Sequence, residues 1–292
     1  MICPQSVAEI NEENHNKMTT IALFGAGGKM GMRLGKNLKD SRYVVRPVEV
    51  GEAGRRRLAD ELGWQAVDSD YALADADVVI LAVPDTAIGK VASGIIDKLK
   101  PGTIVVTLDA AAPFAGHLPD RKDITYFVTH PCHPPIFNDE TEMPAKLDRF
   151  GGVAAKQAIV SALMQGPEEH YAIGEEVART IWSPILRSHR LTVEQMALLE
   201  PGLAETVCGS LLDVLREAMD EVVRRGVPPE AARDFLLGHM NIMAAVIFKE
   251  QSGVFSDACN KAIEFGKPVL MRDDWKRVFE PDEIMASIRR IT

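Results

Sequence analysis

The sequence lacks the features that mark membrane-spanning and nucleic-acid-binding proteins. No apolar run approaches the roughly 20 residues that a helix needs to cross a bilayer, so we expect no membrane partner. Basic residues are in deficit, with 33 Lys and Arg against 42 Asp and Glu and a formal net charge of -9. Because a phosphate backbone is bound by a basic protein face, this charge argues against a nucleic-acid partner.

Cysteine is also scarce. The four cysteines lie far apart and form no CxxC pair, which fits reduced thiols in a cytoplasmic protein. The first 17 residues have neither the basic start nor the long apolar core of a signal peptide. We therefore expect residues 1–18 to form a disordered tail. The sequence contains no internal repeat and no low-complexity segment.

The stretch from Thr20 to Gly31 organises the first half of the chain. It reads TIALFGAGGKMG, a short apolar run followed by four glycines in seven residues and then by apolar residues at helical spacing. A strand, a glycine turn and a helix in this order let the backbone and the helix N-terminus approach a pyrophosphate. The predicted cofactor-binding residues of this turn are Gly25, Ala26, Gly27, Gly28, Lys29 and Met30.

An acidic residue stands where a dinucleotide site requires one. The apolar stretch Tyr43 to Val48 ends at Glu49, 24 residues after Gly25, which is close to the roughly 20 expected for the acid that binds the adenosine ribose. Such a carboxylate repels a 2′-phosphate, so we expect NAD rather than NADP. The arginines at 55–57 follow on a charged helix. One interpretation places them near the adenosine ribose, and the one that we favour is a solvated helix face.

Strands alternate with helices at short intervals through the first 190 residues. The clearest buried strand is Val78–Val83, and further strands are expected at Thr103–Leu108 and Ile124–Val128. This pattern predicts an α/β fold, a Rossmann-type doubly wound and mostly parallel sheet over residues 19–190, which binds its ligand at the carboxyl ends of the strands. Pro84 and Asp85 lie at such an end and are expected at the cofactor. Asp109 lies at another.

The segment His130–Thr141 has the highest density of polar and ionisable side chains that could take part in a reaction. It holds two histidines, a cysteine, an amide and two acids in twelve residues, together with three prolines that stiffen it. Loops at this edge of such a sheet often carry catalytic groups. The alternative is a rigid loop whose polar groups cap helices. We take His130 and His133 as the catalytic candidates.

The strand pattern disappears after Leu191. Residues 191–292 are expected to form a smaller, all-helical domain for substrate binding and dimerisation, with Thr192 as the N-cap of its first helix and a kink at Pro201-Gly202. Apolar residues around Gly238 occupy more than one helix face. This excess predicts a homodimer that buries the helical domain against a second copy.

Several strings in the sequence resemble the D-apionate oxidoisomerases. The resemblance covers residues 20–290 and rests on GAGGKMG, LDAAAPFAG, ITYFVTHPCHPPIFNDET, KQAIVSALMQGPEEHYAIG and EQMALLEPGL. It places the chain within the wide 6-phosphogluconate and β-hydroxyacid dehydrogenase group. It implies NAD-linked oxidation of a branched hydroxy acid, a sugar-acid substrate, coupled to migration of its carboxylate, which gives 3-oxo-isoapionate.

This chemistry requires a base for the hydroxyl proton and a group that polarises the new ketone. His130 can supply an imidazole, and Glu200 or Glu194 a carboxylate from the first helix of the second domain. We expect His130 and Glu200 to bind a divalent metal, zinc or magnesium, and His133 to carry protons with a pKa near neutrality. Alternatively, Glu200 is a helix-surface acid beside Pro201.

Two other functions compete with this interpretation. The first is a simple NAD(P)-dependent dehydrogenase of a 3-hydroxy acid or of a prephenate-like substrate. The 3-hydroxy-acid group commonly uses a lysine on the first helix of the second domain, and Leu191–Leu212 contains none. The second is a dinucleotide-binding redox sensor without enzymatic activity. A sensor needs no polar loop, so the composition of His130–Thr141 counts against it.

Overall fold

The computed structural model describes residues 18–292, and the expected disordered tail therefore lies, but for Met18, outside the described residues. The chain divides into two compact units. The first, here called the sheet unit, comprises the residues up to Pro134, Glu140–Met196 and Thr292. The second, here called the helical unit, comprises Pro135–Asp139 and Ala197–Ile291.

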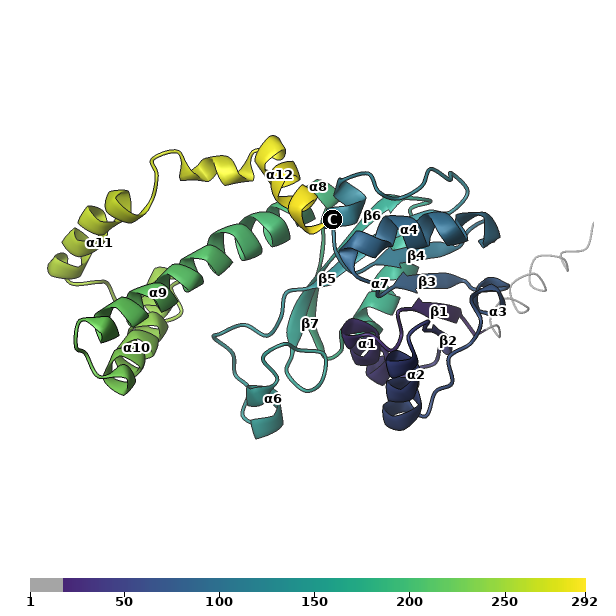
Figure 1. The fold of residues 1–292 in the computed structure, drawn as a ribbon, viewed down its shortest axis with the longest axis horizontal. Helices are drawn as coiled ribbons and strands as arrows, with labels where there is room; N and C mark the ends of the chain where they lie inside the picture. The colour runs from purple at the N-terminus through teal and green to yellow at the C-terminus, as the bar shows by residue number, and fades with distance from the viewer. Residues whose placement is uncertain (1–17) are drawn as a thin grey trace, which may run out of the picture. The chain divides into compact units, whose positions relative to one another are not determined.

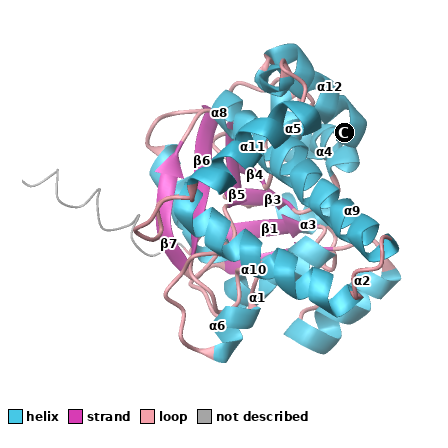
Figure 2. Cartoon of the chain, turned by 90° about the vertical axis from the view of Figure 1, so that its left-hand side faces the viewer, coloured by secondary structure: helices cyan, strands magenta, loops and turns pink. Residues whose placement is uncertain are grey.

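The sheet unit is built on seven strands in the order β2-β1-β3-β4-β5-β6-β7 (Figures 1 and 2). The first five strands are parallel, β6 is antiparallel to β5, and β7 is parallel to β6. The predicted Rossmann-type, mostly parallel sheet is confirmed. The strands are β1 (Thr20–Phe24), β2 (Val44–Val48), β3 (Val78–Leu81), β4 (Ile104–Thr107), β5 (Thr125–Pro131), β6 (Gln157–Gln165) and β7 (Ile185–Arg190).

Helices connect these strands and cover both faces of the sheet, as expected when successive strand residues point to opposite sides. In β1, Ile21 and Leu23 pack into one apolar cluster, whereas Ala22 and Phe24 pack into another. The elements of this unit are α1 (Lys29–Lys39), α2 (Glu52–Arg57), the π-helical turn η2 (Leu58–Leu62), α3 (Ser69–Leu73), α4 (Asp85–Ile95), η3 (Ile96–Lys98), α5 (Ala111–Phe114), α6 (Met143–Leu147) and α7 (His170–Ile181).

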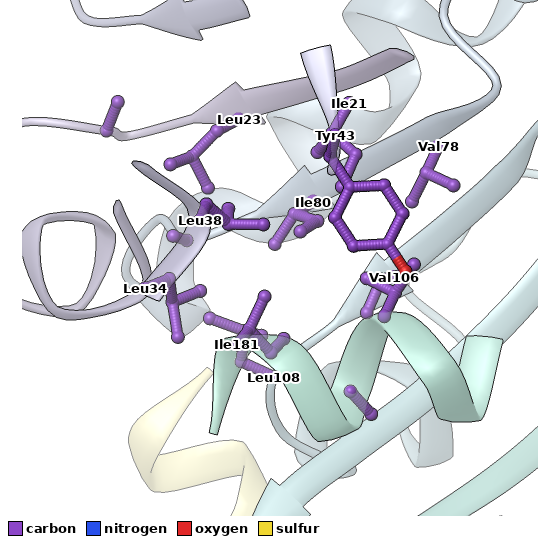
Figure 3. Close-up of a cluster of buried hydrophobic side chains, with 14 of the residues drawn as sticks. Ile21, Leu23, Leu34, Leu38, Tyr43, Val78, Ile80, Val106, Leu108 and Ile181 are labelled. Carbon is purple, nitrogen blue, oxygen red and sulfur yellow. The ribbon is translucent and has the colours of Figure 1, made fainter. Parts of the chain in front are cut away.

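The first cluster joins the sheet to α1 and α7. Figure 3 shows Leu34 and Leu38 of α1 and Ile181 of α7 beside side chains of β1, β3 and β4. Leu34, Leu38 and Ile181 are almost completely buried. Because α1 begins at the glycine turn, this packing fixes the turn relative to the sheet.

Two parts of the sheet differ from the sequence-based expectation. β5 runs to Pro131 instead of ending at Val128, because β6 pairs with its last residues and His130 faces Val160. The second difference is β7, since the sequence pattern predicted no strand over Ile185–Arg190. It lies at the edge of the sheet, and its mixed, mostly exposed residues carry no clear apolar alternation.

The apolar run that begins at Gly152 forms a strand only from Gln157 onward, in β6. The preceding residues are held in a loop by Asp148. Its carboxylate accepts hydrogen bonds from the backbone N–H groups of Val153, Ala154 and Ala155. These amides are therefore withdrawn from strand pairing.

α8 (Val193–Ala197) leads into the helices of the second unit. Its expected N-cap is confirmed: Gln195 N–H donates to the Thr192 hydroxyl, and Thr192 N–H donates to the Gln195 side chain. Pro201 lies inside a π-helical segment, since proline has no N–H for the α-helical bond.

The helical unit contains no β-strand among its described residues. Its elements are η4 (Leu198–Gly209), α9 (Ser210–Arg224), α10 (Pro229–Ile247), α11 (Asp257–Leu270), η5 (Trp275–Phe279) and α12 (Pro281–Ile291). α12 packs on η4 and η5, and α10 packs on α9. Within residues 18–292, no helix is both long and apolar enough to span a bilayer.

Candidate functional site

The glycine turn between β1 and α1 has the close packing expected of a dinucleotide-binding loop. Gly25 has φ +72°, in the left-handed region that favours glycine. A Cβ on Gly31 would lie 2.1 Å from the carbonyl oxygen of Gly25. Gly25, Gly28 and Gly31, spaced three residues apart, therefore let α1 start directly against the turn.

Backbone hydrogen bonds fix the turn to the end of β2. Gly25 and Ala26 both donate to the carbonyl of Val48, at 3.0 and 3.1 Å, and Gly28 donates to Gly25 at 2.9 Å. The first amides of α1, beginning at Lys29, follow. Amides in the first turn of a helix have no intrahelical acceptor and lie at the positive end of the helix dipole. They are the groups suited to bind a pyrophosphate.

Glu49 lies beside this turn, at the carboxyl end of β2. Its Oε2 accepts a hydrogen bond of 3.0 Å from Gly27 N–H, and its Oε1 accepts one of 2.7 Å from Gly51 N–H. A carboxylate has about four acceptor sites, so both oxygens keep acceptor capacity for ribose hydroxyls. The structure therefore holds a negative charge at the place that the sequence pattern assigned to the ribose-binding acid.

The arginines that follow Glu49 do more than form a solvated face. All three are exposed, as expected, and Arg56 pairs with Glu52. Arg55 Nε donates to the Glu49 carbonyl at 2.8 Å, whereas Arg57 donates to the Gly27 carbonyl through Nε at 3.0 Å and Nη2 at 2.6 Å. The last turn of α2 thus holds the glycine turn in place through Arg57.

Polar residues gather where β3, β4 and β5 approach their carboxyl ends. Pro84 and Asp85 start α4 after β3, Asp109 follows β4, and His130 is the penultimate residue of β5. Burial raises the pKa of Asp85, and the Asp109 carboxylate raises it further, whereas His130 opposes the shift. The three ionisable groups therefore act on one another electrostatically within the sheet unit.

His130 is held in one tautomer. Its Nδ1 lies 2.8 Å from the carbonyl oxygen of Leu108 and 3.9 Å from Oδ2 of Asp109. A carbonyl oxygen only accepts hydrogen bonds, so Nδ1 carries a proton and Nε2 carries the lone pair of the neutral ring. Both side chains are about one-fifth exposed. The imidazole can accept a proton or bind a metal through Nε2.

His133 lies just beyond the strand, with φ +61°. Its Nδ1 donates to the carbonyl of Phe150 at 2.8 Å, and its ring packs edge-on against the Phe150 ring, with 4.7 Å between centroids. The ring of His130 is 6.0 Å away. Burial lowers the pKa of His133 below its ordinary value, so the ring is neutral at pH 7.

In the described part of the chain, other polar groups of this segment satisfy backbone atoms of loops and cap no helix. The Asn138 amide donates to the carbonyl of Pro135 at 2.7 Å. The Glu140 carboxylate accepts the N–H of Lys156 at 2.9 Å. The two histidines thus remain the chemical candidates of the segment.

Asp109 is the functional candidate that sequence reasoning did not select. Its carboxylate accepts a hydrogen bond from Ala111 N–H and faces His130. The available signal was its position directly after a buried strand. Glu200 belongs to the helical unit, where it is partly buried in η4 beside Pro201. Its catalytic role remains a prediction.

Two family models match the chain. The model described as the C-terminal part of phosphogluconate dehydrogenase (decarboxylating) matches residues 138–292, more than half of the chain. The model described as NADP oxidoreductase, coenzyme F420-dependent, matches residues 20–111. These matches place the chain in the 6-phosphogluconate dehydrogenase-like group.

Individual relatives are more similar. A D-apionate oxidoisomerase from Rhizobium rhizogenes is 74% identical, with 94% of this chain and 100% of the relative covered. One from Cupriavidus necator is 71% identical, with 93% and 99% covered. A solved structure of a semialdehyde dehydrogenase NAD-binding protein from Cupriavidus necator, in complex with calcium and NAD, is 70% identical with a TM-score of 0.93; it covers 94% of this chain and 100% of its own.

Proposed function

Since the chain belongs to the D-apionate oxidoisomerase family and is thus an NAD-dependent oxidoreductase, we propose that it oxidises D-apionate to 3-oxo-isoapionate. In this reaction NAD accepts a hydride from a substrate carbon, the hydroxyl proton passes to a base, and the carboxylate moves to the neighbouring carbon. The migration itself is redox-neutral. The observation that carries the proposal is His130, fixed with a basic Nε2 near the carboxyl edge of a dinucleotide-binding sheet.

The glycine turn and Glu49 fit the two halves of NAD. The first-turn amides of α1, at Lys29 and Met30, are suited to the pyrophosphate, and Gly25 to Gly28 shape the turn beneath it. The Glu49 carboxylate is suited to the diol of the adenosine ribose. Pro84 and Asp85, at the start of α4 after β3, are proposed as further cofactor-binding residues.

His130 is the proposed base for the substrate hydroxyl. Its Nδ1–H is held by the Leu108 carbonyl, so Nε2 is the atom that takes the proton as the hydride leaves. Asp109 lies near the same Nδ1 and stabilises the imidazolium that forms. His133, whose neutral ring lies edge-on to His130, is proposed to carry the proton onward.

The residues of this edge fit a divalent metal in their donor chemistry. Asp109 offers a carboxylate oxygen and His130 an imidazole nitrogen, and a backbone carbonyl bound to the other ring nitrogen is a common support for a metal-ligating histidine. A metal bound at Nε2 of His130 would polarise the new ketone oxygen as a Lewis acid. His130 would then act as a ligand, and His133 would take the hydroxyl proton in its place. We propose Glu200 as a further ligand, since its carboxylate would suit zinc, magnesium or calcium.

The helical unit is proposed to form a homodimer interface. Large apolar side chains are exposed along α10 and α11, among them Phe235 at 69%, Phe265 at 76% and Leu270 at 76%. Exposed large apolar side chains in such number mark an interaction site in many proteins. A second copy of the same chain would bury it symmetrically.

Product analysis tests the proposed reaction. The purified protein is incubated with D-apionate and NAD, and the product is identified by NMR while NADH is followed by absorbance. We expect one NADH per product and a carboxylate shifted to the adjacent carbon. An unrearranged keto acid would assign the protein to simple dehydrogenases, and a chain that forms no NADH from branched acids would reject the proposal.

A further inference from the structure

We propose that Gly54 is a positioning residue for cofactor discrimination, because only a residue without a side chain lets the Glu49 carboxylate lie against the glycine turn. This inference rests on the proposed use of NAD. Gly54 is buried in α2, two residues after the helix begins. It makes no contact that would assign it to catalysis, so its effect on the cofactor would act through Glu49.

The space around Gly54 is filled by the Glu49 side chain. A Cβ on Gly54 would lie 2.6 Å from Cδ of Glu49, and 2.8 Å from both Cγ and Oε2. Carbon and oxygen atoms of folded proteins essentially never approach a Cβ below 3.0 Å. Gly54 has an ordinary helical backbone, which alanine also adopts. In a Gly54→Ala variant the new methyl group therefore clashes with the end of the flexible Glu49 side chain. We expect the Glu49 carboxylate to move away from it.

This movement would break the geometry that Glu49 now has. Its Oε2 accepts from Gly27 N–H at 3.0 Å, and this is the oxygen closest to the Cβ position of residue 54. Its Oε1 is held by Gly51 N–H. Both glycine amides are parts of the frame that surrounds the predicted ribose site. A displaced carboxylate would no longer present its remaining acceptor sites to the ribose diol.

The surrounding charges make the position of this carboxylate decisive for specificity. Arg55 is anchored on the Glu49 carbonyl, and Arg56 is exposed on the same short helix. Guanidinium groups bind phosphates well. With the Glu49 carboxylate in place, a 2′-phosphate meets a negative charge. With the carboxylate displaced, the same helix presents cationic groups to that phosphate.

The test compares Gly54→Ala with Gly94→Ala in the full chain. Gly94 is an exposed glycine of α4, and its Cβ position has no neighbour within 4 Å. Dissociation constants for NAD and NADP are measured by calorimetry, and thermal melts report folding. We expect Gly54→Ala to bind NAD about tenfold more weakly and to narrow the preference for NAD over NADP, since a hydrogen bond to a charged group is disturbed. Gly94→Ala should keep the wild-type values.

A double variant separates positioning from packing. Aspartate is one methylene shorter than glutamate, so Glu49→Asp in the Gly54→Ala background makes room for the new methyl group. We expect this pair to recover part of the NAD preference lost in Gly54→Ala. If Gly54 had only a structural role, Gly54→Ala would lower the affinities for NAD and NADP equally. Glu49→Asp would then not restore the preference for NAD.

The failures of the two proposals are distinguishable. A wild-type chain that binds neither dinucleotide overturns the proposed function and this inference with it. A wild type that prefers NAD, with Gly54→Ala unchanged, unfolded, or equally weakened toward both dinucleotides, overturns the inference alone. Absence of any rescue by Glu49→Asp does the same.

Discussion

The imidazole Nδ1 of His130 lies 2.8 Å from the carbonyl oxygen of Leu108. These residues belong to adjacent strand ends, and the contact leaves Nε2 as the basic atom of the ring. A second neighbour, Asp109, has its Oδ2 3.9 Å from the same Nδ1. The backbone that follows the neighbouring strand therefore determines which ring nitrogen of His130 can accept a proton.

Replacing His130 should therefore abolish the proton transfer but spare the cofactor. His130→Gln is expected to lower kcat by about 10²- to 10⁴-fold, the usual contribution of a positioned general base. NAD affinity, measured by fluorescence titration, should stay close to that of the wild type. His117→Gln, at an exposed position after α5, is the matched control. A wild-type kcat in His130→Gln would contradict its assignment as base.

Glu49→Gln should weaken NAD binding and reduce discrimination against NADP. The substitution removes the charge but keeps the shape of the side chain. Loss of a hydrogen bond to a charged group is worth about 1.5–3 kcal/mol, which corresponds to about a ten- to hundredfold change in affinity. Glu52→Gln, whose carboxylate pairs with exposed Arg56, serves as the control in the same calorimetric titration. A wild type that prefers NADP would show that Glu49 is assigned wrongly.

The pH dependence of turnover should reflect the neutral state of His133. Burial places its pKa below the ordinary value of 6.5, so the folded state binds fewer protons than the unfolded chain between that lowered pKa and 6.5. His133 therefore contributes a loss of stability as the pH falls through this window, and it remains a competent base down to below pH 6.5. We expect kcat/KM to show no acid limb from His133 above pH 6.5. A limb above that value that vanishes in His133→Gln would contradict the direction of the shift.

Glu200→Gln should abolish the isomerised product and leave NAD binding largely intact. The reason is that the carboxylate is proposed to hold a metal that acts on the new ketone, a step after cofactor binding. Glu194→Gln distinguishes Glu200 from the other candidate acid, whose pKa is lowered first by a hydrogen bond from Thr192. Product NMR and NAD titration provide the two readouts.

Removal of the metal gives an independent check of the same site. Chelator-treated protein should lose turnover, and added zinc, magnesium or calcium should restore it to different extents. Full turnover by metal-free protein would exclude the metal role and leave His130 as base alone.

The exposed apolar faces of the helical unit predict a dimer of the 32.0 kDa chain. Light scattering at micromolar concentration should give about twice this mass. Phe265→Asp should shift the protein toward the monomer, because a charge would be buried in the interface. Ile173→Asp, on an exposed face of α7 in the sheet unit, is the control. A monomeric wild type would reject the prediction.

Local features of the sequence were enough to predict the glycine turn and the cap of α8. The glycine spacing at residues 25–31 identified a turn that only glycine can form, because Gly25 has a positive φ and Gly31 contacts the Gly25 carbonyl. The cap at Thr192 was readable for the same reason, since its partner Gln195 is three residues away. The order of apolar strands and helices likewise predicted the mostly parallel sheet.

The tertiary structure decided the features that depend on residues distant in sequence. β5 reaches His130 and Pro131 because β6 returns antiparallel beside it, and strand pairing between distant segments leaves little trace in local periodicity. The tautomer of His130 is set by Leu108, 22 residues away. The place of the Glu49 carboxylate is set by the amide of Gly27 and the empty Cβ position of Gly54. The residue types were enough to select His130 and Glu49 as candidates. Which atoms they contact depends on the packing of segments that are distant in the sequence.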